Sequence, residues 1–232
     1  MPVTAQAPNR PVRSFVRRSA RMTAAQRAAI ECRWPAYGLD AEGVLDLDAV
    51  FGRRAPRTME IGFGNGETMV NLAEAHPERD YLGVDVYEPG IGRLLAAVAQ
   101  RHLANVRLLR ADAVDVLHDH IAPTSLCAVL LWFPDPWPKK RHHKRRLIQA
   151  DFVKLVATRL EPGGRFCLAT DWQHYAEHML AVLDDEESLV NQAGKGNFCV
   201  EHADRPETKF ERRGRRLGHE VWDLRFERRG PP

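Results

Sequence analysis

The stretch TMEIGFGNGETMVNLAEAHP, residues 58–77, decides the fold of this chain. It starts with a short apolar run, continues through Gly62, Gly64 and Gly66, and then has helical spacing up to Pro77. Glycines that join a buried strand to a helix let the backbone approach a ligand closely at the helix N-terminus. The stretch therefore predicts a strand, a ligand-binding turn made of these three glycines, and a helix.

The same pattern of strand, turn and helix continues along the chain on both sides of an apolar run at 125–133. Strands that alternate with helices predict an α/β, Rossmann-like fold with a mostly parallel sheet. Two strand-like segments near the end, NFCVEH at 197–202 and HEVWDLRFER at 219–228, predict an antiparallel hairpin at the sheet edge. Helical spacing at 145–160 and 172–185 predicts the last two helices.

Composition limits the class of protein. The 232 residues are 44% hydrophobic with a net charge of +3, which suits one globular domain at 22–232 after a basic, flexible arm at 1–21. The four cysteines lie far apart without metal-ligand spacing, which indicates reduced thiols and a cytoplasmic protein. No apolar run has the ~18 residues that a membrane span needs.

The charges around the glycine turn indicate which ligand it holds. Glu60 precedes the turn, Glu67 follows it, and no lysine or arginine lies within it. Two carboxylates would repel a pyrophosphate but suit a ligand with positive groups, such as the amino and sulfonium centres of S-adenosylmethionine. The alternative is that Glu60 only caps or pairs locally.

Acidic residues also follow the next two predicted strands. Asp85 lies about 20 residues beyond the turn, where an acid typically accepts ribose hydroxyls in both nicotinamide and S-adenosylmethionine enzymes. Asp112 either accepts the adenine amino group or caps the following helix, and its spacing favours neither. All these acids are expected at the carboxyl ends of the parallel strands, where open α/β proteins bind ligands.

Asp135 follows the fourth strand in the segment FPDPWP, residues 133–138. Its flanking prolines restrict the backbone, so the carboxylate is held on a stiff loop beside Trp132 and Trp137. An aromatic ring next to a rigid acceptor suits a flat, hydrogen-bonding substrate such as a nucleobase. The alternative is an ordinary turn whose tryptophans belong to the core.

A cationic run follows this loop. It consists of Lys139, Lys140, Arg141, Lys144, Arg145 and Arg146. The arm and the segment RPETKFERRGRRLG at 205–218 are also basic, and such segregation in a chain of net charge +3 predicts contacts to the phosphates of a nucleic acid. A solvated charged face is the alternative.

In these residues the chain resembles the bacterial tRNA (guanine-N7)-methyltransferase family, over roughly residues 57–228. The matching motifs are EIGFGNG, FPDPWPKKRHHKRRL, LATDWQHYAEHML and RPETKFERRGRRLGHEVWDLRFER, in that order. The resemblance implies methyl transfer from S-adenosylmethionine to guanine-46 of the tRNA variable loop, giving 7-methylguanosine and S-adenosylhomocysteine. It implies no metal, no membrane and no obligatory protein partner.

The resemblance also implies roles for individual residues. Glu60, Asp85, Asp112 and Asp135 are expected to line the donor site, and Asp135 is also the expected catalytic residue. The expected substrate and RNA contacts are Lys139, Arg141, His142, His143, Lys144, Arg145, Arg146, Asp171, Thr208, Lys209, Phe210 and Glu211. The chain departs from the family at Asp85, where glutamate is common.

The chemistry of guanine N7 agrees with this set of residues. N7 carries an in-plane lone pair and has no proton to lose, so its methylation needs placement and a nearby negative charge rather than a general base. The rival functions are a nicotinamide oxidoreductase, a non-catalytic RNA-binding protein, and a nucleic-acid methyltransferase that acts on an exocyclic amine.

Overall fold

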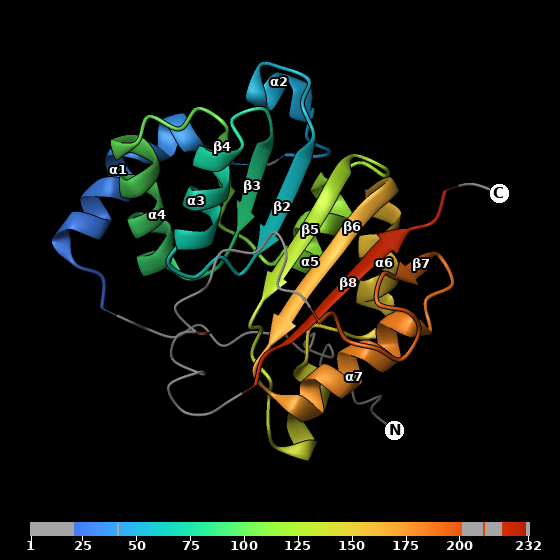
Figure 1. The fold of residues 1–232 in the computed structure, drawn as a ribbon. Helices are drawn as coiled ribbons and strands as arrows, with labels where there is room; N and C mark the ends of the chain where they lie inside the picture. Colours follow the sequence, from blue (N-terminus) through green and yellow to red (C-terminus); the bar gives the residue numbers. More distant parts are fainter. Residues whose placement is uncertain (1–20, 41, 201–210, 212–219, 231–232) are drawn as a thin grey trace, which may run out of the picture.

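An eight-stranded sheet forms the centre of the structure. The computed structural model describes residues 21–40, 42–200, 211 and 220–230, and its strands lie in the order β1-β4-β3-β2-β5-β6-β8-β7 (Figure 1). Strands β1 to β6 are parallel, whereas β8 pairs antiparallel with both β6 and β7. The strands are β1 (Gly38–Leu39), β2 (Arg57–Ile61), β3 (Asp80–Val84), β4 (Val106–Leu109), β5 (Leu126–Trp132), β6 (Leu160–Thr170), β7 (Leu189–Asn191) and β8 (Trp222–Arg228).

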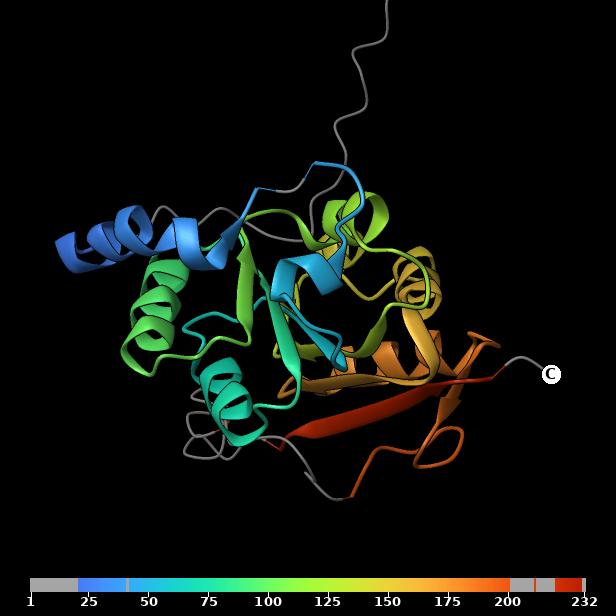
Figure 2. The same cartoon turned by 90° about the horizontal axis from the view of Figure 1, so that it is seen from above.

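Helices connect successive parallel strands, as right-handed crossovers require. Helix α1, shown in blue, packs against α4 at the end of the molecule opposite β7 and β8 (Figures 1 and 2). The α-helices are α1 (Ala24–Tyr37), α2 (Leu47–Phe51), α3 (Glu67–Ala75), α4 (Glu88–Gln100), α5 (Ala113–Asp115), α6 (Ala150–Arg159) and α7 (Gln173–Asp184). A π-helical turn, η1 (Val116–His120), continues α5, and a 3₁₀ helix, η2 (Lys140–Arg145), follows β5.

The direction in which strands are added reverses between β2 and β5. From β2 the chain builds β3 and β4 on one side, and it then returns to place β5 and β6 on the other side of β2. In open α/β sheets the ligand crevice lies at this reversal, beyond the carboxyl ends of the strands. The loops after β2 and β5 therefore border the expected binding site.

The sheet is buried on both faces. In β3, Tyr81 belongs to the apolar cluster that includes Leu94 of α4, whereas Leu82 lies in the larger cluster with Val153 of α6. Side chains alternate between the faces of a strand, so each face of the sheet meets its own layer of helices. This packing explains why the central strands read as continuous apolar runs.

The predicted alternation of strands and helices and the predicted antiparallel pairing near the end of the chain are confirmed, but the segment at 197–202 is not the strand that pairs with β8. Among the described residues of that segment, Cys199 makes only an isolated bridge with Asp223. The strand that pairs with β8 is β7, whose first residue, Leu189, is buried in the core. Turns at positive φ through Gly194 and Gly196 end that strand and redirect the chain before it reaches 197.

The predicted helix at 145–160 begins later than expected. Helix α6 starts at Ala150, because Gln149 is extended and the preceding basic residues form η2 instead. The predicted arm at 1–21 falls outside the described residues apart from Arg21. Among the helices that the structure describes, none has the length and apolarity needed to cross a membrane.

Candidate functional site

The glycine turn between β2 and α3 has the geometry that its sequence predicts. Gly62, Gly64 and Gly66 have φ angles of 69°, 57° and 75°, a region that favours glycine. The N–H of Gly66 donates to the carbonyl of Phe63 at 2.8 Å, and Gly66 is the N-cap of α3. The turn therefore directs backbone and a helix N-terminus toward the crevice at the strand reversal.

Asp85 braces this turn from the end of β3. One carboxylate oxygen accepts the N–H of Gly64 at 2.9 Å, and the other accepts those of Val86 at 2.7 Å and Tyr87 at 2.9 Å. Burial raises the pKa of Asp85, and these three backbone donors oppose that shift. The expected ribose contact stays a prediction, and the structure adds a scaffold role that sequence reasoning missed.

Glu60 is a buried acid without full hydrogen bonding. Its side chain is 3% exposed, and Oε2 has no hydrogen-bond partner among the described residues. Burial, and secondarily the charge of Asp85, raise the pKa of Glu60 to about 8. If Glu60 only capped or paired locally, its buried Oε2 would still lack a hydrogen bond. A ligand with donor or positive groups would supply one.

Gly90 in the first turn of α4 is a residue of the site that sequence reasoning missed. A Cβ atom at this position would lie 1.9 Å from the carbonyl oxygen of Gly64. Only a glycine lets α4 approach the glycine turn so closely. The signal in the sequence was a glycine inside a helical pattern, which often marks a close packing contact.

Asp112 caps the helix that follows β4. Its Oδ1 accepts the N–H of Val114 at 3.0 Å, in the N-cap position of α5. The capping alternative is thus confirmed. The adenine contact stays a prediction.

The loop that carries Asp135 is held in an unusual backbone conformation. Phe133 and Trp137 have φ angles of 51° and 46°, which non-glycine residues rarely adopt. The N–H of Phe133 donates to the carbonyl of Ala169 in β6 at 2.8 Å, and the carbonyl of Pro136 accepts from Nε of Arg146 at 3.0 Å. Such conformations persist where the surroundings fix them, and they cluster at functional sites. Asp135 itself is exposed.

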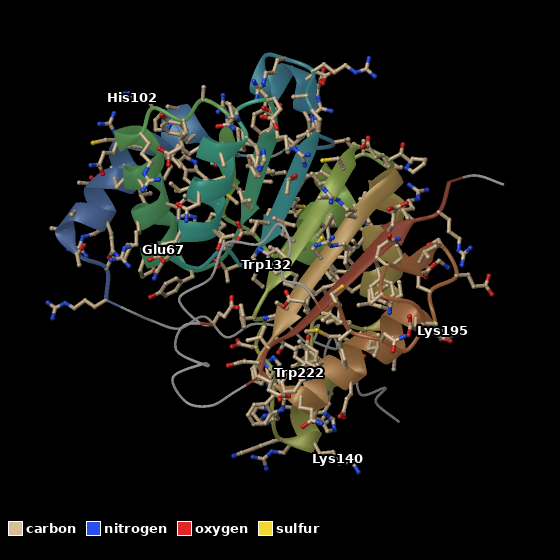
Figure 3. All side chains as sticks on the ribbon, viewed as in Figure 1. Glu67, His102, Trp132, Lys140, Lys195 and Trp222 are labelled. Carbon is tan, nitrogen blue, oxygen red and sulfur yellow. The ribbon has the colours of Figure 1, made fainter. Side chains whose placement is uncertain are left out.

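The cationic run forms a surface around this loop. Lys139, Lys140, Arg141 and Lys144 are exposed, and Lys140 points outward at the lower end of the molecule (Figure 3). The guanidinium of Arg145 lies 5.0 Å from the ring centre of Trp137, as in a cation–π contact. Trp137 also meets the ring of His142 edge-on at 5.8 Å. The loop and the basic helix η2 are therefore one packed unit.

Arg146 contradicts the expectation that it contacts RNA. Its side chain is 2% exposed, which leaves no surface for a phosphate. The helical register of η2 ends at Arg145, and the chain then turns inward, so Arg146 packs 4.8 Å from the ring centre of Tyr175. Burial lowers the pKa of Arg146. The basic run thus consists of exposed residues and one buried arginine.

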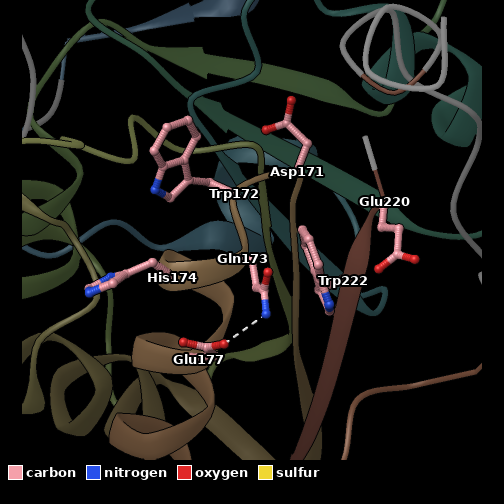
Figure 4. Close-up of a pocket in the computed structure, with 7 residues that line it drawn as sticks. All are labelled: Asp171, Trp172, Gln173, His174, Glu177, Glu220 and Trp222. Carbon is pink, nitrogen blue, oxygen red and sulfur yellow. Dashed lines mark hydrogen bonds between the residues drawn. The ribbon is translucent and has the colours of Figure 1, made fainter. Parts of the chain in front are cut away.

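A cavity of about 670 Å³ opens at the end of β6, on the side of Asp171. Trp172 and Trp222 stand on either side of it, with Asp171 and Glu177 at opposite ends (Figure 4). Trp172 is 38% exposed, a large fraction for a tryptophan, which is highly buried on average. The structure thus brings one of the predicted substrate residues, Asp171, together with two aromatic rings that sequence reasoning had not assigned.

The remaining expected substrate contacts lie near the end of the chain. Thr208, Lys209 and Phe210 fall outside the described residues. Glu211 is buried. Among the described residues, no three histidine, cysteine, aspartate or glutamate side chains are grouped as a metal site.

Several known proteins similar to this chain are described as tRNA (guanine-N(7)-)-methyltransferases. A family-level sequence model described as "Putative methyltransferase" matches residues 54–224. A tRNA (guanine-N(7)-)-methyltransferase of Alkalilimnicola ehrlichii is 58% identical over 96% of this chain and 95% of its own length. One from Leifsonia xyli subsp. xyli is 56% identical over 92% of this chain and 94% of its own.

The chain belongs to the tRNA (guanine-N7)-methyltransferase family. Solved structures support the fold. The 16S rRNA methyltransferase KamB has a TM-score of 0.58 with 14% identity, covering 84% of this chain and 99% of that one. The aminoglycoside resistance methyltransferase NpmB1 has a TM-score of 0.55 with 16% identity, covering 79% and 92%. The predicted Rossmann-like methyltransferase fold is thus confirmed.

Proposed function

We propose that this protein transfers the methyl group of S-adenosylmethionine to N7 of guanine-46 in the variable loop of tRNA. The observation that carries the proposal is identity above 50%, over nearly the full length, to proteins named tRNA (guanine-N(7)-)-methyltransferase. The proposal includes action in the cytoplasm by a domain at 22–232 that follows a basic arm.

Residues in β2 and in the loops after β2 and β3 fit the methyl donor. When bound, S-adenosylmethionine supplies an electrophilic methyl group on a positively charged sulfonium. Glu60 would hold its positive groups, since Oε2 lacks a partner among the described residues and lies in a buried site. Gly64 and Gly66 would place backbone against it, and Asp85 would keep that backbone in position.

Asp135 suits methyl transfer to a ring nitrogen. Guanine N7 has no proton to lose, so the protein must align it with the donor and stabilise the positive charge that develops on the purine. Asp135 provides a carboxylate on a loop fixed by Phe133 and Pro136. No general base is needed for this step.

The surface beyond Asp135 suits a structured RNA. Lys139, Lys140, Arg141 and Lys144 are exposed together on η2 and just before it, where they would contact phosphates and position the tRNA. The cavity between Trp172 and Trp222 offers aromatic faces for a base that is out of the stack, and Asp171 offers a hydrogen-bond acceptor.

Mass spectrometry of nucleosides tests the proposed activity. The protein is incubated with bulk tRNA and methyl-labelled S-adenosylmethionine, and the tRNA is then digested. The expected label appears in 7-methylguanosine alone. Label in an N²- or N⁶-methylated nucleoside would show that the chain acts on an exocyclic amine. A complete absence of label, together with quenching or enhancement of nicotinamide fluorescence on titration, would support the oxidoreductase instead.

A further inference from the structure

Arg146 differs from every other member of the cationic run. Lys139, Lys140, Arg141 and Lys144 are exposed, whereas Arg146 is among the largest fully buried side chains of the described residues. A charged group in the interior is costly unless hydrogen bonds and packing compensate for the removal of water. Its contacts therefore indicate what the position is for.

The contacts of the Arg146 side chain join the Asp135 loop to helix α7. Nε donates to the carbonyl of Pro136 at 3.0 Å, and Nη2 lies 3.2 Å from Nδ1 of His174. Because a guanidinium can only donate, Nδ1 of His174 is the acceptor in this contact. The guanidinium also packs on the ring of Tyr175. Among the described residues no carboxylate lies within ion-pair distance of Arg146.

The carbonyl that Arg146 holds belongs to the residue directly after Asp135. On the other side of Asp135, the N–H of Phe133 is bound to Ala169 of β6. The backbone is thus fixed two residues before the carboxylate and one residue after it. His174 and Tyr175 lie in the first turn of α7, three and four residues after Asp171, which lines the cavity.

We infer that Arg146 is a positioning residue for methyl transfer: it sets the Asp135 loop against the N-terminus of α7 and makes no contact with RNA phosphates. The inference rests on the proposed function for its effect on rate. The geometric part, that Arg146 restrains residues 133–138, stands without it. A planar fork is required, because Pro136 and His174 are bound through different nitrogens of one guanidinium.

Arg146→Lys tests the inference because it keeps the positive charge and removes the fork. Lys154→Ala, an exposed lysine of α6 outside the site, serves as the control. Single-turnover rates are measured with donor and tRNA saturating, and tRNA affinity is measured over a range of salt. Displacement of a catalytic group by about 1 Å can cost ~10²-fold in rate. We expect Arg146→Lys to lose at least tenfold in rate, with affinity within twofold of the parent and an unchanged salt slope.

Hydrogen exchange of the peptide 131–138 provides a second readout that needs no activity. In Arg146→Lys the amide of Phe133 is expected to exchange faster, whereas Lys154→Ala leaves it as in the parent. If the parent itself fails to methylate tRNA, the proposed function fails, and exchange alone then decides on the restraint. Unchanged exchange in Arg146→Lys would overturn the inference, as would a parental rate at saturation combined with a smaller salt slope, which would make Arg146 a phosphate contact.

His174 variants keep the test decisive if Arg146→Lys does not fold. His174 is exposed, so its replacement does not open the core. His174→Ala removes the acceptor of Nη2 and is expected to slow methyl transfer by severalfold, while His174→Asn offers a carbonyl oxygen near the position of Nδ1 and is expected to restore most of the rate. Equal rates for His174→Ala and the parent would contradict the inference.

Discussion

Glu60 links protonation to stability at the scale of a single residue. Its pKa in the folded protein is about 8, raised by burial and by Asp85 from an ordinary value of 4.5. Between these values the folded state holds a proton that the unfolded chain has released, so the free energy of unfolding decreases as pH rises from about 4.5 to about 8. Below 4.5 both states are protonated, and the contribution no longer changes with pH.

Glu60→Gln should remove this pH dependence, because glutamine matches the protonated acid in size and has no proton to lose. As pH rises from 6 to 8, the parent should lose about 2 kcal/mol in the free energy of unfolding through Glu60, and the variant should not show this loss. Urea unfolding at the two pH values measures the difference. A parallel pH dependence in the two proteins would mean that Glu60 is already ionised when folded.

The same substitution should weaken donor binding, since the neutral amide cannot pair with the positive groups of S-adenosylmethionine. In the parent, donor binding to the ionised carboxylate must release the proton, so the affinity should rise with pH up to about 8. Calorimetry across pH 6–9 checks both expectations. If the variant binds S-adenosylmethionine as tightly as the parent at pH 9, Glu60 does not contact the positive groups of the donor.

Asp135 is the residue expected to stabilise the positive charge that develops on the purine. Asp135→Asn keeps the shape of the side chain but removes the charge that would stabilise the cationic purine. Removing one preorganised electrostatic interaction typically costs ~10²–10³ in rate. Single-turnover rates with saturating donor and tRNA should show this decrease while tRNA affinity changes little. A variant as fast as the parent would leave placement alone as the source of catalysis.

At the scale of secondary-structure elements, the glycine turn depends on how closely α4 approaches it. In Gly90→Ala the new methyl group would overlap the carbonyl of Gly64, so the turn or the helix must move. Overpacking of this kind typically costs about 1–3 kcal/mol. Because the turn borders the donor site, calorimetry should show weaker binding of S-adenosylmethionine. Gly230→Ala, where a Cβ meets nothing, is the control and should bind normally.

The exposed residues of η2 should act through salt-dependent binding. Arg141→Ala combined with Lys144→Ala should lower tRNA affinity and reduce the slope of log affinity against log salt by up to ~0.9 for each duplex phosphate that the variant no longer binds. Donor affinity should not change. The buried Arg146 is left intact in this variant, so that weaker phosphate binding is separated from movement of the Asp135 loop. Equal salt slopes in parent and variant would make η2 an ordinary solvated face.

Local patterns predicted the elements whose conformation is decided locally. The glycine turn at 62–66 and the helix after it follow from residue types alone, and the structure agrees. The burial of Arg146 could not be read from its basic neighbours, because it depends on Tyr175 and His174, almost 30 residues away. The prediction of the strand that pairs with β8 was wrong for a similar reason. Leu189 packs in the core, so β7 pairs with β8 in place of the more β-prone segment at 197–202.

At the scale of the whole molecule, the sheet brings together residues from distant parts of the sequence. Glu60 and Gly64 border the strand reversal from one side, and the Asp135 loop borders it from the other, because β2 and β5 are neighbours. The cavity beside Asp171 lies one strand further along, at the end of β6. The strand order therefore places the donor site, the carboxylate of Asp135 and the cavity beside Asp171 one after another along the carboxyl ends of the strands.

The residues at the carboxyl ends of these strands are proposed to direct the methyl group to N7 of one guanine in tRNA. This proposal is tested most directly by a tRNA in which guanine-46 is replaced by 7-deazaguanine, so that a carbon stands where N7 was. Incorporation of labelled methyl groups is compared with the same tRNA carrying guanine at that position. We expect full labelling of the guanine-containing tRNA and none of the 7-deaza tRNA, with equal affinity of the protein for both. Methylation of the 7-deaza tRNA would contradict the proposal, because the acceptor would then be another atom.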